Sequence, residues 1–308
     1  MADLLHLVDK PEGWTSHDVV ARLRGLLGER RIGHAGTLDP FATGLLLVAE
    51  GRATGLLGCL SLLPKRYRAR ARLGVATDTQ DRTGAPVRVS QELPCPRRVE
   101  EAITALASLT LQRPPLYSAV KVRGERLYRA ARRGEAPERE ERPIQVYDVT
   151  PVDPNPPEVV FDVCVSRGTY VRTLAHDLGE SLGCGAHLVS LRRTESGPFR
   201  VEDALEPDAT SGHDAAAFRA RAIAPHDAVP HLARVTLTDE EAARVRHGHA
   251  PPVDPARIAP APRPYPLPPD EPPAPIALLA PSGALFALAE APGSAPAGAP
   301  LRLVRVLV

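Results

Sequence analysis

The chain has 308 residues, of which 43% are apolar and only 4% aromatic, so its core must rely on Leu, Val and Ala. This length predicts about two domains with a large core. The formal net charge of +1 excludes a strongly basic or acidic protein, but it leaves RNA binding open because basic side chains can gather within a balanced total.

Cysteine usage and hydropathy limit the cellular context. The four cysteines show none of the paired spacings of zinc or redox sites and are predicted to be free thiols: Cys59, Cys95, Cys164 and Cys184. The N-terminus lacks the charge order and apolar length of a signal peptide, and no apolar run could cross a bilayer. We therefore predict a cytoplasmic protein.

The N-terminal third begins with a short strand from Leu4 to Val8. Thr15 and Asp18 have the spacing of a capping box, followed by a helical stripe: Val19, Val20, Leu23, Leu26 and Leu27. Residues 53–63 are predicted to form a buried helix. The run from Lys65 to Gly74 alternates apolar and arginine residues, which predicts a strand with one buried face and one row of guanidinium groups.

The middle of the chain contains several ambiguous polar clusters. Asp78 and Asp81 lie among Thr and Gly, a pattern that is more typical of a turn than of a metal site. Cys184 and His187 lack two further ligands, so the glycines around them predict a tight turn. A helix is predicted from Arg97 to Leu109.

A strand from Val159 to Ser166 is predicted to end at Gly168, with Thr169 capping the next helix. Arg172 then falls in the first helical turn, where a cation opposes the helix dipole at a cost of about 0.3–1 kcal/mol. We therefore expect a carboxylate partner for Arg172.

The C-terminal part changes in character. Residues 205–229 are predicted to be a connecting helix or linker, and Thr238 with Glu241 forms a second capping box. Three strands are predicted at residues 276–280, 285–289 and 301–308, which gives a small β-rich module.

The central stretch from Gly33 to Val48 places Asp39 before Pro40 and just ahead of an apolar strand. The residue before a proline favours extended backbone, so Asp39 should occupy a fixed turn. On physical grounds alone, Asp39 could be an ordinary helix cap or turn residue. The short, uniformly apolar run after Thr43-Gly44 weakens the helix-cap alternative.

The string Gly-His-Ala-Gly-Thr-Leu-Asp-Pro-x-Ala-x-Gly-Leu-Leu resembles the central motif of the TruB-type tRNA pseudouridine synthases. Further blocks follow in family order: Asp-Lys-Pro-x-Gly-x-Thr-Ser at residues 9–16, Lys-x-Tyr at 65–67, Gly-Thr-Tyr-x-Arg at 168–172, and Leu-Arg-Arg-Thr at 191–194. The segment from Gln112 to Tyr147, with Tyr-Ser-Ala-x-Lys at 117–121, resembles the family's RNA-clamping insertion. The similarity spans most of residues 4–200.

The resemblance implies that a uridine in the T loop of tRNA, at tRNA position 55, is isomerised to pseudouridine without metal or cofactor. It makes Asp39 the nucleophile and Arg172 its ionic partner. Tyr67 would stack on the uracil and is the candidate for proton transfer. Tyr170 would orient Asp39 and Tyr67 through its hydroxyl. The implied RNA-contacting and supporting residues are His34, Leu191, Lys65, Lys121 and Lys10. His34 would fill the space that the flipped base leaves, and Leu191 would line the base pocket.

The predicted architecture is α+β. A catalytic domain over residues 1–230, with a mixed, largely antiparallel sheet and the insertion at 112–147, precedes a PUA-like RNA-binding domain over residues 231–308. We expect tRNA as the partner, with no membrane, no required protein partner and a monomeric state. Two other hypotheses remain: a non-catalytic RNA-binding or RNA-folding protein on the same scaffold, and a glycosidase. The latter would need a second carboxylate about 5–10 Å from Asp39.

Overall fold

The computed structural model describes residues 2–118, 120–122, 124–135, 137–207, 212–251, 253–262, 273–290 and 301–307. The chain divides into two compact units: the first comprises Met1–Leu63 with Ser196–Val308, and the second comprises Pro64–Glu195. This division does not follow the predicted domain border near residue 230, so that border stays a prediction.

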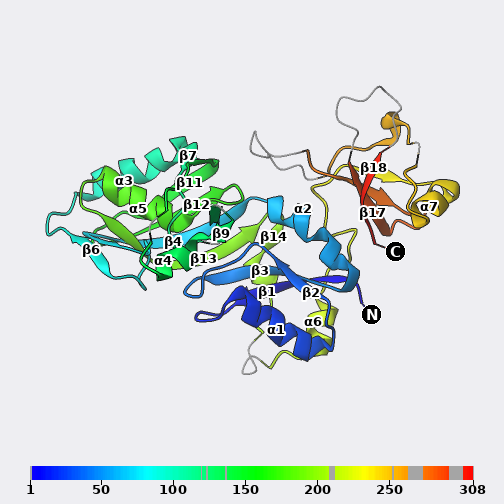
Figure 1. Cartoon of the computed structure of the whole chain (residues 1–308), viewed down its shortest axis with the longest axis horizontal. Helices are drawn as coiled ribbons and strands as arrows, with labels where there is room; N and C mark the ends of the chain where they lie inside the picture. Colours follow the sequence, from blue (N-terminus) through cyan, green and yellow to red (C-terminus); the bar gives the residue numbers. More distant parts are fainter. Residues whose placement is uncertain are drawn as a thin grey trace. The chain divides into compact units, whose positions relative to one another are not determined.

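The N-terminal part of the first unit is built on three antiparallel strands (Figure 1). These are β1 (Leu4–Lys10), β2 (Ile32–Ala35) and β3 (Thr43–Glu50), with β3 paired to both of the others. Helix α1 (Ser16–Leu27) has the predicted capping box between Thr15 and Asp18, and its apolar face packs with Val8, Leu46 and Phe218. The predicted strand and helix are both confirmed.

Residues 51–62 differ from the single predicted helix. They form a 3-10 helix, η1 (Gly51–Leu56), followed by α2 (Leu57–Leu62). Gly51 has φ of +64°, and a Cβ there would lie 2.4 Å from the Ala2 carbonyl oxygen. The apolar pattern therefore predicted burial correctly, but the tight passage at Gly51 starts the segment as a 3-10 helix rather than an α-helix.

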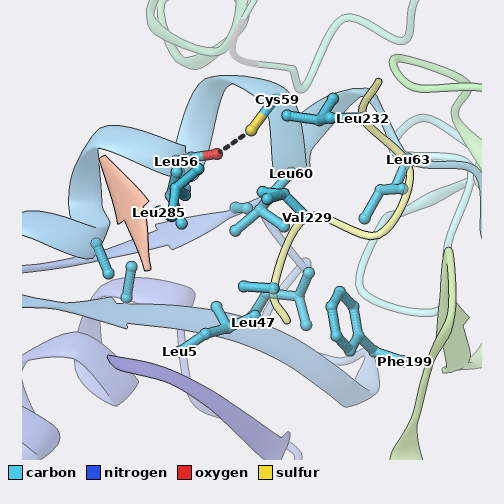
Figure 2. Close-up of a cluster of buried hydrophobic side chains, with 14 of the residues drawn as sticks. Leu5, Leu47, Leu56, Cys59, Leu60, Leu63, Phe199, Val229, Leu232 and Leu285 are labelled. Carbon is cyan, nitrogen blue, oxygen red and sulfur yellow. Dashed lines mark hydrogen bonds between the residues drawn. The ribbon is translucent and has the colours of Figure 1, made fainter. Parts of the chain in front are cut away.

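The core of the first unit gathers leucines from segments far apart in the sequence. Figure 2 shows Leu5 and Leu47 from the N-terminal strands, Leu56 and Leu60 from η1 and α2, and Leu285 from the C-terminal sheet. Cys59 donates to the Leu56 carbonyl at 3.0 Å, and burial raises the pKa of its thiol to about 12. The four cysteines are free, as the sequence predicts.

The C-terminal part of the first unit is β-rich, as predicted. Its four-stranded sheet runs in the order β15 (Arg234–Thr236), β16 (Ile276–Leu279), β17 (Leu285–Glu290), β18 (Arg302–Val306), with a parallel first pair and antiparallel pairs thereafter. Helix α7 (Asp239–Arg246) begins with the predicted capping box between Thr238 and Glu241. The remaining short elements in the described part of this unit are β14 (Phe199–Arg200), η3 (Val201–Asp203), α6 (Ala215–Ala220) and η5 (Pro255–Arg257).

The second unit contains a sheet with strand order β13-β4-β12-β11. The strands are β13 (Ala186–Ser196), β4 (Lys65–Leu73), β12 (Glu158–Val165) and β11 (Val146–Asp153), and β12 is antiparallel to both β4 and β11. The predicted alternation of β4 is confirmed, with Tyr67 on the buried face.

The outward arginine row of β4 is matched by acids on the neighbouring strands. Arg68 pairs with Asp162 at 2.8 Å and Arg70 with Glu158 at 3.4 Å, both on β12. Arg66 pairs with Asp148 of β11 at 2.8 Å, and this hydrogen bond raises the pKa of Arg66. These three arginines thus form an ion-pair ladder across the sheet, which lowers their value as an RNA-binding surface.

Two helices and several short elements complete the second unit. Helices α3 (Pro96–Ala105), continued by η2 (Leu106–Ser108), and α5 (Val171–Ser181) lie near their predicted positions. The prediction for the cap of α5 was wrong, because Tyr170 and not Thr169 is its N-cap. The Thr169 hydroxyl instead lies 3.2 Å from the Ser166 hydroxyl. The other elements are β5 (Val75–Thr77), β6 (Pro86–Val89), β7 (Leu111–Gln112), β8 (Lys121–Val122), β9 (Glu125–Arg126), α4 (Leu127–Arg132) and β10 (Arg142–Pro143).

Candidate active site

Asp39 lies in the loop between β2 and β3, where the sequence predicted a non-helical turn. The Ala42 amide donates to the Asp39 carbonyl at 3.1 Å, which closes the turn ahead of β3. Asp39 is half-buried between the buried Leu38 and the exposed Pro40. The loop therefore holds a half-buried carboxylate four residues before the core strand β3.

Lys10 holds the Asp39 loop through a hydrogen bond to the Pro40 carbonyl. It is fully buried at the end of β1, and its ammonium donates to three carbonyls, those of Pro11 at 2.9 Å, Trp14 at 2.6 Å and Pro40 at 3.2 Å. A buried ammonium is tolerable only when its donors are satisfied, and it has three to offer. Lys10 therefore ties the turn at residues 10–14 to the residue that follows Asp39, a supporting role.

A second clamp acts on the residue that precedes Asp39. The Leu38 amide donates to the Ser16 hydroxyl at 2.9 Å, and that hydroxyl lies 3.3 Å from the Leu38 carbonyl. The Gly13 amide also donates to the Pro40 carbonyl at 2.8 Å. Both neighbours of Asp39 are thus bound to residues 10–16, which restricts the direction of its side chain.

His34 stands on β2 of the same unit. Its ring meets the ring of His17 edge to face, with centroids 5.8 Å apart. His34 is half-buried, and its register opposite Val48 places it two residues before the turn that leads to Asp39. The contact of His34 with RNA stays a prediction.

Tyr67, Leu191 and Arg193 share one face of the second unit's sheet. Tyr67 is 9% exposed on β4, and the Arg193 guanidinium carbon lies 6.0 Å from the centre of its ring. Residues two apart on a strand point the same way, so Leu191 lies on the same face of β13 as Arg193. The sequence did not single out Arg193, although this residue lies in the Leu-Arg-Arg-Thr block, two residues after Leu191.

Arg172 is held at three points near the start of α5. Its guanidinium donates to the carbonyls of Thr79 at 3.0 Å and Tyr117 at 3.1 Å, and to the Asp81 carboxylate at 3.3 Å. The side chains of Arg172 and Asp81 are only 5% and 6% exposed. The expected carboxylate partner therefore exists within the second unit, and it is Asp81; the pairing of Arg172 with Asp39 stays a prediction.

Asp81 belongs to the turn that the sequence favoured over a metal site. Its other carboxylate oxygen accepts from the Thr79 and Thr83 hydroxyls at 2.8 and 2.6 Å and from the Thr83 amide at 2.9 Å. These bonds leave the carboxylate directed at Arg172. Among the residues that the structure describes, no group of three His, Cys, Asp or Glu side chains could hold a metal ion.

Tyr170 precedes Arg172 and caps α5 with its backbone. The Gln112 amide binds this backbone twice, accepting from the Tyr170 N–H at 2.8 Å and donating to its carbonyl at 3.1 Å. Lys65 begins β4 and is 5% exposed, while the side chain of Lys121 lies outside the described residues. The contacts of Lys65 and Lys121 with RNA therefore stay predictions.

Comparison with known proteins decides the family. The model of the "TruB family pseudouridylate synthase (N terminal domain)" matches residues 24–171, and that of the "tRNA pseudouridylate synthase B C-terminal domain" matches residues 172–218. The "tRNA pseudouridine synthase B" of Thermobifida fusca is 45% identical over 302 residues, which cover 94% of this chain and 95% of that protein. The chain belongs to the TruB family of pseudouridylate synthases.

Other relatives agree with this assignment. The protein of the same description from Geobacter sulfurreducens is 46% identical to the synthase over 251 residues, or 80% of this chain and 81% of that one. Among solved structures, the "Crystal Structure of a Cbf5-Nop10-Gar1 Complex" is similar over 99% of this chain and 85% of that chain, with a TM-score of 0.74 and 29% identity. The "Structure of H/ACA RNP bound to a substrate RNA containing 2'-deoxyuridine" matches with a TM-score of 0.70 and 26% identity.

The synthase is therefore an isomerase that forms pseudouridine, and the predicted α+β class is confirmed. Within the described part of the synthase, no helix has the length and hydropathy needed to cross a membrane. The residues proposed for its chemistry fall into two sets: Asp39, His34 and Lys10 lie in the first unit, and Tyr67, Tyr170, Arg172 and Leu191 lie in the second.

Proposed function

We propose that the substrate is a uridine in the T arm of tRNA and that Asp39 is the nucleophile. The observation that carries this proposal is the double clamp on the Asp39 loop, in which Lys10 and Gly13 hold Pro40 while Ser16 holds Leu38. Such preorganisation is unnecessary for a surface turn, and it removes the entropy of aligning a carboxylate for attack.

The second unit supplies groups suited to the flipped base. Extruding a uridine from folded RNA costs a few kcal/mol of unstacking. Stacking on an aromatic ring such as that of Tyr67 returns about 1–3 kcal/mol per base. Leu191 on the same sheet face adds an apolar wall against which the detached uracil can turn before it is rejoined through carbon.

The cation of Arg172 would favour the ionised Asp39 and fix its direction once both act on the same nucleotide. The Arg172 side chain has little freedom, because its guanidinium already donates to three acceptors, one of which is the Asp81 carboxylate. Tyr170 would orient Asp39 and Tyr67, and Tyr67 would carry any proton transfer. No metal or cofactor is part of this proposal.

We also propose a domain organisation, further RNA contacts and a cellular location for the protein. A catalytic domain over residues 1–230 and a PUA-like domain over residues 231–308 would contact different parts of the tRNA. His34 and the lysines Lys65 and Lys121 would contact the RNA, directly or by supporting its contacts. The protein would act in the cytoplasm as a monomer without a protein partner.

The test is pseudouridine formation on an unmodified T-arm stem-loop, comparing wild type with Asp39→Asn. Loss of the nucleophilic charge at nearly constant volume should lower the single-turnover rate by about a thousandfold or more. RNA affinity should stay close to that of wild type, because the amide retains the size of the side chain.

Three outcomes separate the hypotheses. Product from wild type alone, with equal RNA affinity, supports the proposal. Tight binding without product from either protein would move the chain to the RNA-binding or RNA-folding class and return Asp39 to the role of a turn residue. Release of free uracil would favour the glycosidase.

A further inference from the structure

The insertion between Gln112 and Tyr147 joins the second unit through a two-stranded ribbon. Its strands are β7 and β10, and Gln112 pairs with Arg142 while Leu111 pairs with Pro143. We call this ribbon (Leu111–Gln112 with Arg142–Pro143) the neck. Because both ends of the insertion pass through it, the neck is one route by which a displacement of the insertion can act on the unit.

Gln112 is the neck residue that faces inward. It is only 4% exposed, and both polar atoms of its side-chain amide bind Tyr170, the N–H at 2.8 Å and the carbonyl at 3.1 Å. The same Tyr170 carbonyl accepts from the amides of Thr173 and Leu174, the first bonds of helix α5. Tyr170 makes no side-chain capping bond, and Gln112 satisfies its N–H, one of the amides at a helix start that have no intrahelical acceptor.

A second pair of bonds ties the neck to the other end of the same loop. The Ser166 amide donates to the Gln145 carbonyl at 2.9 Å, and the Gln145 amide donates to the Ser166 hydroxyl at 2.9 Å. The loop from Ser166 to Tyr170 is thus bound at both of its ends by residues in or beside the neck.

Arg172 also touches the insertion directly. One guanidinium nitrogen donates to the carbonyl of Tyr117, five residues into the insertion, at 3.1 Å. The backbone of Tyr170 and the side chain of Arg172 are therefore both set by the segment that the sequence assigns to RNA clamping.

We infer that Gln112 is a positioning residue, which couples the insertion's neck to Tyr170 and Arg172 and so aligns them when RNA engages the insertion. The inference rests on the proposed function of these two residues. It predicts that removing the two hydrogen bonds between Gln112 and the Tyr170 backbone slows the chemical step without weakening RNA binding.

The experiment is single-turnover pseudouridine formation at saturating enzyme, with RNA affinity and thermal unfolding measured in parallel. Gln112→Met keeps the side-chain length and removes both hydrogen bonds. We expect its rate to fall by about tenfold or more, because small displacements of aligned groups have effects of that size. The dissociation constant for the stem-loop should be unchanged.

Thr173→Val provides the matched control. Thr173 is 3% exposed in the first turn of the same helix, and its hydroxyl donates to the Gln80 side chain at 2.8 Å, outside the neck. It should lower the melting temperature as Gln112→Met does while keeping the wild-type rate. Equal rate losses in both variants would show that general destabilisation of α5, and not loss of the Gln112–Tyr170 hydrogen bonds, is responsible.

Gln112→Glu provides a readout that mere packing would not give. Its ionised carboxylate can accept from the Tyr170 N–H but cannot donate to the Tyr170 carbonyl, whereas the protonated acid can do both. Burial raises the pKa of a carboxyl group, so the acid should become protonated between about pH 7 and pH 5. The rate of Gln112→Glu relative to wild type should therefore recover as the pH falls, while that of Gln112→Met stays flat.

The outcomes distinguish this inference from the proposed function. If wild type forms pseudouridine and Gln112→Met does so at the same rate, the inference is wrong and the proposed function stands. If wild type forms none, the proposed function fails first. A rate loss accompanied by an equal loss of RNA affinity would make Gln112 part of the binding surface instead.

Discussion

The loop that carries Asp39 and the helix start that carries Arg172 are fixed in different ways. Around Asp39, the anchors Lys10, Gly13 and Ser16 come from one short segment and bind mostly backbone carbonyls and amides. Around Arg172, the anchors Asp81 and Tyr117 come from turns 91 and 55 residues away in sequence. The first arrangement is a local motif, and the second depends on the packing of the whole unit.

Breaking the Asp81–Arg172 pair should give the largest loss of stability. Asp81→Asn removes the charge of one partner of a buried ion pair, which costs about 3–5 kcal/mol. Urea unfolding should show this loss together with a fall in turnover. Asp162→Asn is the control, because its pair with Arg68 is exposed by 26% and 58% and should contribute less than about 1 kcal/mol. Similar losses in the two variants would refute the special role of the buried pair.

Removing the Lys10 ammonium should have a smaller effect. Lys10→Met leaves the acceptors of Pro11, Trp14 and Pro40 without this donor at a cost of about 2–3 kcal/mol. The loop would loosen, so the turnover number should fall while RNA affinity is kept. The exposed Arg52, paired with Asp3, gives the control Arg52→Met, which should change neither stability nor turnover appreciably. Unchanged turnover in Lys10→Met would separate the clamp from catalysis.

The smallest effect on stability is expected at the N-terminal cap of α1, where Thr15 and Asp18 form the capping box. Hydrogen bonds from the Thr15 amide and hydroxyl lower the pKa of Asp18 below its ordinary value of 3.8. A carboxyl whose pKa is lowered on folding stabilises the fold above its unfolded pKa, and this contribution disappears as pH falls through the folded value. Asp18→Asn should therefore lower the melting temperature at pH 7 less than Lys10→Met does, and the difference from wild type should shrink below about pH 3. A difference that persists at acid pH would assign the effect to packing.

Local signals made most elements of the fold predictable. The capping boxes at Thr15 and Thr238 and the alternation of β4 depend on residues within a few positions of one another, and each was confirmed. The prediction failed where a non-local contact intervened, as at Gly51, which passes against the Ala2 carbonyl and begins a 3-10 helix. It also failed at Thr169, since the helix is capped one residue later, at Tyr170, whose backbone N–H is bound by Gln112 from the neck.

The candidate site follows the same division. The motif around Asp39 is contiguous, so its residues and the supporting role of Lys10 could be predicted from the sequence. No local pattern predicted the contacts of Gln112, Asp81 and Arg193, although each touches a residue that the sequence selected. An expected partner for Arg172 could be inferred from its charge at the start of a helix, but the identity of that partner could not.

The sequence by itself determined the family and most of the secondary structure, and it supplied the candidates for the reactive side chains, because those depend on short motifs and periodicity. Tertiary structure alone decided which acid holds Arg172, which amide holds Tyr170 and which acids meet the arginines of β4. These contacts join residues 58 to 94 positions apart, and such pairings depend on the register of strands and the docking of an insertion. No local pattern encodes that geometry.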